Sequence, residues 1–144
     1  MSGIVVGLDG SPHSEQVLEW ASREAALRRV PLKVIRVHQP VVGWNDTLDL
    51  IEDQATSERV RKAALAQTDC VLDRLGARAP AKVVVDARSG SAAEELLRAA
   101  AGADLVVVGS HGAGGFARLV MGSVSAQVCR LAQCPVVVIP APRQ

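Results

Sequence analysis

The segment that decides the fold is ADLVVVGSHGAGGFARLVMGS, residues 103–123. Its apolar, β-branched beginning, residues 103–109, predicts a buried strand. A loop rich in glycine follows, and apolar residues at helical spacing begin again at Ser123. Glycine weakens helices and strands, so this cluster indicates a backbone that turns sharply or lies close to another group. The segment therefore predicts a strand, a glycine loop and a helix in succession.

The rest of the chain repeats this alternation of strand and helix. We expect strands over residues 3–8, 32–37, 81–86, 103–109 and 134–140, and helices over residues 14–30, 50–75, 92–100 and 123–132. Ser91 and Glu94 have the spacing of a capping box at the start of the third helix. Alternation of this kind predicts parallel strands with helices on both faces. Five strands are too few for an eight-stranded barrel, so an open doubly wound sheet is favoured.

Composition narrows the class of protein. The 144 residues suffice for one domain, expected to span residues 1–144, and 49% of them are hydrophobic. Aromatic residues make up 2% and the net charge is +1, which argues against a nucleic acid as the partner. We see no signal peptide and no apolar run long enough to span a membrane, and the three cysteines form no CxxC pair. A cytoplasmic protein that does not bind membranes is expected.

The glycine loop has the chemistry of an anion site. Backbone N–H groups in such a loop, together with the N-terminus of the helix after it, favour a phosphate group. A Walker A loop requires a lysine that is absent here, and the stretch after the first strand, VGLDGSPHS, lacks the GxGxxG of dinucleotide-binding domains. The alternative interpretation is that the loop is only a flexible connector. It leaves the small polar residues at the start of the helix unexplained.

The spacing Gly109-x2-Gly112-x9-Gly122-Ser123 resembles the signature of the universal stress protein family, in its ATP-binding branch. The stretches IVVGLDGSPHSEQVLEWA, MGSVSAQV and CPVVVIP extend the resemblance over nearly the whole chain. It implies the strand order 3-2-1-4-5, in which the loops after the first and fourth strands face one site at the carboxyl ends of the strands.

The resemblance also implies a set of residues that bind ATP, with or without Mg²⁺ bound to its phosphates. Asp9, flanked by Gly7, Gly10 and Ser11, would contact the adenosine part, and Val37 would line the adenine pocket. Val108, Gly109, His111 and Gly112 would shape the floor and ribose side, while Gly114 and Gly115 would give the loop its freedom. The phosphates would be bound by Gly122, Ser123, Val124 and Ser125.

Several of these residues have a second interpretation. Asp9 is also a common type of residue for capping a turn, and His111 is also typical of a solvated loop. Arg118, the cation in the loop, would either pair with a phosphate or lie at the surface. No residues with the spacing of a metal site are recognised.

The expected function is a nucleotide-dependent regulatory switch in the stress response, with at most slow ATP hydrolysis because no dedicated catalytic base is visible. The last apolar run, at the edge of the sheet in the implied order, predicts a homodimer, since an exposed edge strand invites pairing. Two alternatives remain: a nucleotide-free interaction module of the same fold, and an ATP-using enzyme that attacks the α-phosphate. The second would need a substrate domain for which 144 residues leave no room.

Overall fold

The computed structural model describes residues 2–43, 45–110 and 122–141. The strands are β1 (Ile4–Leu8), β2 (Leu32–His38), β3 (Val83–Ser89), β4 (Leu105–Gly109) and β5 (Val136–Ile139). The helices are α1 (Ser14–Arg28), α2 (Asp46–Leu75), α3 (Ala92–Ala99) and α4 (Ser123–Leu131), with a short 3₁₀ turn at Gly76–Arg78. The predicted alternation of strands and helices is confirmed.

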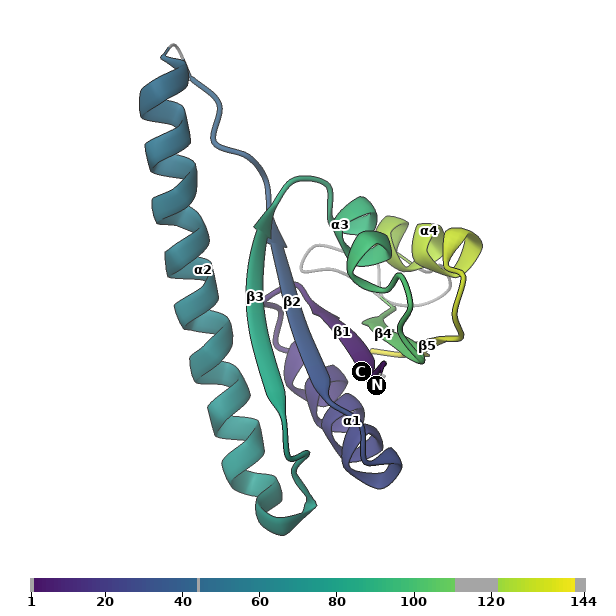
Figure 1. The fold of residues 1–144 in the computed structure, drawn as a ribbon. Helices are drawn as coiled ribbons and strands as arrows, with labels where there is room; N and C mark the ends of the chain where they lie inside the picture. Colours follow the sequence, from purple (N-terminus) through teal and green to yellow (C-terminus); the bar gives the residue numbers. More distant parts are fainter. Residues whose placement is uncertain (1, 44, 111–121, 142–144) are drawn as a thin grey trace.

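The strands form one parallel sheet in the order β3-β2-β1-β4-β5. This is the order expected from the sequence, with β1 and β4 adjacent where the order reverses. Figure 1 shows β1 between β2 and β4, with the helices on either side of the sheet. The loops that follow β1 and β4 therefore leave the same edge of the sheet.

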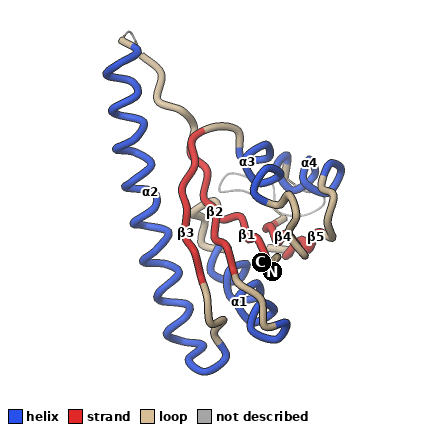
Figure 2. The backbone as a smooth tube through the Cα atoms, viewed as in Figure 1, coloured by secondary structure: helices blue, strands red, loops and turns tan. Residues whose placement is uncertain are grey.

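Two apolar layers hold the helices against the sheet. On one face, α1 and α2 pack on alternate strand residues, among them the buried Ile4, Val6, Val34 and Val107. On the other face, Leu96 of α3 and Val128 of α4 pack on the remaining set, among them Val5, Ile35 and Val106. Figure 2 shows the helices in blue around the red strands. Because β1 and β4 at the centre of the sheet are covered on both faces, they consist of valine, leucine and isoleucine apart from one glycine each.

Helix α2 is longer than the sequence indicated. The expected start at residue 50 is wrong, because Asn45 caps the helix through its side-chain oxygen, which accepts hydrogen bonds from the backbone N–H groups of Thr47 and Leu48 at 3.0 and 3.1 Å. The buried residues of α2 all lie in its second half: Ala64, Thr68, Val71 and Leu75. Its N-terminal end extends beyond the sheet (Figure 1).

Three hydrogen bonds fasten the first half of α2 to the ends of β2 and β3 and to the loop after β2. Asp53 accepts hydrogen bonds from the Val41 N–H and the Ser89 hydroxyl, both at 2.9 Å. The Ser57 hydroxyl lies 2.6 Å from Nε2 of His38 at the end of β2. No helix in the described part of the chain is long and apolar enough to cross a membrane.

Candidate functional site

A pocket of about 130 Å³ lies at the carboxyl ends of β1, β2 and β4, on the face covered by α3 and α4. We call it the carboxyl-edge pocket. Its walls are mostly apolar, and Asp9 is the acidic residue among them. The lining residues are Gly7, Leu8, Asp9, Ile35, Val37, Ala92, Leu96, Val108, Gly109 and Val124.

The sequence predicted part of this lining. Six predicted residues lie in it together: Gly7, Asp9, Val37, Val108, Gly109 and Val124. Gly10, Ser11, Gly122, Ser123 and Ser125 are described but do not line it. The other predicted residues lie outside the described part of the chain: His111, Gly112, Gly114, Gly115 and Arg118. The structure thus brings Asp9, the end of β4 and the first turn of α4 to one place.

Asp9 organises the turn between β1 and α1. Its Oδ1 accepts hydrogen bonds from the Ser11 N–H and the Ser14 hydroxyl, both at 2.9 Å. Partial desolvation of the carboxyl raises the pKa of Asp9, but the hydrogen bonds from Ser11 and Ser14 outweigh it and leave the pKa below its ordinary value. Asp9 therefore carries a negative charge at neutral pH and keeps acceptor capacity on its second oxygen.

Gly7 leaves space for a helix side chain at the pocket wall. A Cβ atom at this position would lie 2.7 Å from a methyl carbon of Leu96. Leu96 is 4% exposed and lines the pocket from α3. The absence of a side chain at Gly7 therefore lets Leu96 reach the sheet and form the wall.

The start of α4 is tied to the end of β4. The Gly122 N–H donates to the carbonyl oxygen of Ser110, and the Ser125 hydroxyl lies 3.2 Å from that oxygen and 3.0 Å from the carbonyl oxygen of Gly122. Ser125 is 2% exposed, so its hydroxyl is held inside the fold. Ser123 is the first residue of the helix and is exposed.

The first turn of α4 has three backbone N–H groups without an acceptor in the described part of the chain. The earliest backbone N–H of this helix with an acceptor in the fold is that of Ala126, which donates to Gly122 at 3.0 Å. The N–H groups of Ser123, Val124 and Ser125 have no acceptor among the described residues. Unpaired N–H groups and the positive end of the helix dipole together favour an anion at this position.

Arg36 is a basic residue near the site that sequence reasoning missed. Gly10 has a φ of +78°, and a Cβ built on it would lie 2.5 Å from a guanidinium nitrogen of Arg36. Arg36 on β2 is paired in register with Leu8 on β1, so its side chain reaches the turn that contains Asp9. The sequence could have pointed to Arg36, because a cation at the carboxyl end of a central strand is unusual in a parallel sheet.

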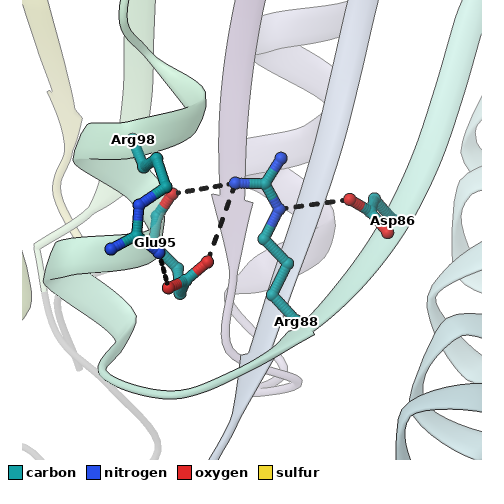
Figure 3. A network of polar contacts seen from close by, with 4 residues as sticks. All are labelled: Asp86, Arg88, Glu95 and Arg98. Carbon is teal, nitrogen blue, oxygen red and sulfur yellow. Dashed lines mark hydrogen bonds and ion pairs between the residues drawn. The ribbon is translucent and has the colours of Figure 1, made fainter. Parts of the chain in front are cut away.

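Four apolar wall residues were also missed: Leu8, Ile35, Ala92 and Leu96. Ala92 and Leu96 belong to α3, and their position over β1 depends on how this helix docks. Figure 3 shows the ion pairs that hold it. Arg88 of β3 donates to Asp86 at 3.1 Å and lies 3.8 Å from a carboxylate oxygen of Glu95, which also pairs with Arg98. These contacts join the end of β3 to the helix that forms the pocket wall.

A scan against models of protein families matches residues 1–140 to the universal stress protein family. The chain belongs to the universal stress protein family. A universal stress protein of Mycolicibacterium smegmatis is 36% identical over 141 residues, which cover 95% of this chain and 47% of the relative. The chain thus spans about half the length of the curated universal stress proteins that it matches.

Solved structures of universal stress proteins have the same fold. That of UspA from Lactobacillus plantarum gives a TM-score of 0.76 at 22% identity and covers 96% of this chain and 97% of the other. One from Archaeoglobus fulgidus, determined in complex with dAMP, gives 0.57 at 27% identity and covers 96% and 98%. At least one universal stress protein of this fold therefore binds an adenine nucleotide.

Proposed function

We propose that this protein binds ATP at the carboxyl-edge pocket and acts as a nucleotide-dependent switch in the stress response. The observation that carries the proposal is the position of this pocket between Asp9 and the first turn of α4. An apolar cleft suited to a flat base thus lies beside a helix N-terminus suited to phosphates. The dAMP complex of the related Archaeoglobus fulgidus protein supports an adenine nucleotide as the ligand.

Each part of the nucleotide has a counterpart in the chain. Val37, Val108 and Leu96 would enclose the base, and a carboxylate oxygen of Asp9 would accept a hydrogen bond from the adenosine part. The N–H groups of Ser123, Val124 and Ser125 would bind phosphate oxygens, with the loop residues His111, Gly112, Gly114, Gly115 and Arg118 completing the site. Mg²⁺ would enter with the phosphates, because no cluster of three metal-binding side chains occurs among the described residues.

The proposal includes a homodimer, residues 1–144 as one nucleotide-binding domain, and a cytoplasmic location. Strand β5 is at the edge of the sheet and pairs on one side with β4. Its outer edge can therefore receive a second strand. Sedimentation equilibrium of the full chain tests the dimer.

Any ATP hydrolysis by the protein is expected to be slow.

The nucleotide content of freshly purified, denatured protein, read by mass spectrometry, tests the function together with a calorimetric ATP titration. Bound ATP in stoichiometric amount, or saturable binding of added ATP, is expected. No nucleotide and no binding at millimolar ATP would contradict the proposal and favour the nucleotide-free interaction module. Retention of ATP with rapid turnover would instead favour an enzyme.

A further inference from the structure

A second cavity, of about 310 Å³, lies at the opposite edge of the sheet, beside the amino ends of β1, β2 and β3. We call it the amino-edge cavity. It shares no lining residue with the carboxyl-edge pocket and is the larger of the two. Its volume is near the lower end of the range of about 300–1,000 Å³ typical of small-molecule sites.

The cavity exists because α3 is too short to cover its face of the sheet. With 8 residues, α3 is about 12 Å long, and the cavity wall on this side consists of Ala99 and residues 101–103. The floor includes Val5, which is buried, and Val84, which remains 44% exposed. An apolar sheet surface is thus left open at this edge.

Lys33 in the floor of the cavity is a charged residue at a position where a buried sheet usually has an apolar one. Register pairs place Val106, Val5, Lys33 and Val84 in one row across four strands. Lys33 therefore interrupts a row of valines on β2, an interior strand. Lys82 precedes Val84 by two residues and projects on the same face, so both lysines line the cavity.

Neither lysine has an acidic partner among the described residues. No ion pair among the described residues involves Lys33 or Lys82. The residues outside the described part contain no Asp or Glu. Two ammonium groups beside an apolar floor are therefore available to an anionic group from outside the chain.

We propose that the amino-edge cavity binds a small amphiphilic carboxylate, such as a medium-chain fatty acid. The apolar chain lies on Val5, Val84 and Ala99, and the carboxylate lies between the ammonium groups of Lys33 and Lys82. Burial of the hydrocarbon chain of the ligand and pairing of its carboxylate both contribute to the affinity. Pairing with one lysine alone would contribute little, since a single ammonium group is a solvated point charge. This site is separate from the proposed nucleotide site and does not depend on it.

Calorimetric titration with decanoate, below its micellar concentration, tests the proposal. Saturable binding to the wild-type protein is expected, and Lys33→Gln and Lys82→Gln are each expected to weaken it about tenfold. Lys62→Gln, which removes the exposed third lysine from α2, is the matched control and leaves the affinity unchanged. Decanol, which lacks the charge, is expected to bind more weakly. No saturable binding, an affinity for decanol equal to that for decanoate, or wild-type decanoate affinity in both lysine variants would overturn the proposal.

A measurement on the wild-type protein locates the ligand without depending on the folding of a variant. Amide chemical shifts in a two-dimensional NMR spectrum are expected to change on decanoate addition at Val5, Val84 and Ala103. Saturation with ATP is expected to leave these changes intact. Changes centred instead on Gly7 and Val108 would place the ligand in the carboxyl-edge pocket and overturn the assignment.

Discussion

Asp9 and Ser14 are joined by a 2.9 Å hydrogen bond from the serine hydroxyl to the Oδ1 of the carboxylate. This bond connects the residue that follows β1 to the first residue of α1. The same oxygen accepts the Ser11 N–H, so the turn at the proposed nucleotide site is fixed before any ligand arrives. A site formed in advance loses less conformational freedom on binding.

The lowered pKa of Asp9 predicts an acid-dependent loss of stability. Because the folded protein holds this carboxyl below its unfolded pKa of about 3.9, the stabilisation is complete above that value and is lost as the pH falls through the folded pKa. Asp9→Asn removes the titration, so we expect a smaller decline in the urea midpoint between about pH 6 and about pH 3. Asp69→Asn, on the exposed side of α2, is the control and should follow the wild type. An unchanged decline in Asp9→Asn would contradict the assignment.

Asp9→Ala is expected to weaken ATP binding while the fold persists. The variant removes the acceptor proposed for the adenosine part and leaves the Ser11 N–H and Ser14 hydroxyl to water, at a cost of about 1 kcal/mol or less to folding. Calorimetry gives the affinity and urea unfolding gives the stability. Unchanged ATP affinity would remove Asp9 from the site.

Gly122→Glu is expected to abolish ATP binding by placing bulk and negative charge at the proposed phosphate position. Gly122 has φ −61° and ψ 161°, a conformation open to other residues, so the backbone itself tolerates a side chain. Gly122→Ala is the matched control, and we expect it to keep most of the affinity. Equal ATP affinity in Gly122→Glu and the wild type would show that the phosphates lie elsewhere.

The contact between Gly7 and Leu96 predicts non-additive stabilities. Gly7→Ala alone would bring its Cβ to 2.7 Å from Leu96 and is expected to destabilise the protein by about 1–3 kcal/mol. Shortening Leu96 to alanine removes the clash, so the double variant should be more stable than the sum of the single changes predicts. Urea unfolding of all four proteins measures the coupling, and simple additivity would refute it.

Removal of the Ser22 hydroxyl is expected to stabilise the protein. Ser22 is 0% exposed, and its Oγ has no hydrogen-bond partner among the described residues. Ser22→Ala should therefore stabilise the protein by about 1 kcal/mol, whereas Thr68→Val, which removes a buried hydroxyl bonded to the Ala64 carbonyl, should bring no gain. Thermal unfolding compares the two variants. Destabilisation of Ser22→Ala would indicate that the hydroxyl has a partner.

The sequence predicted the alternation of elements and, through the family resemblance, the order of the sheet. It could not predict contacts that depend on docking. Leu96 opposes Gly7 only because α3 is fastened to β3 by Arg88 and Glu95. The capping box expected at Ser91 and Glu94 is wrong, because Ser91 makes no side-chain cap bond. The early start of α2 escaped notice because Asn45 stands in a stretch that also contains proline and glycine, which favour a loop.

The anchoring of α2 has a consequence for how the protein opens. At about 45 Å, α2 is packed into the core only from Ala64 onward, and Asp53 and Ser57 fasten its first half. The first turns are held by their own hydrogen bonds, by the Asn45 cap and by one exposed hydrogen bond from the Gly43 N–H to Asp49, with no buried side chain. Amide hydrogens of residues 46–52 should therefore exchange with solvent at rates typical of helix fraying, while those of residues 64–75 should exchange only on global unfolding. The N-terminal end of the longest helix would thus unwind and re-form while the sheet stays folded.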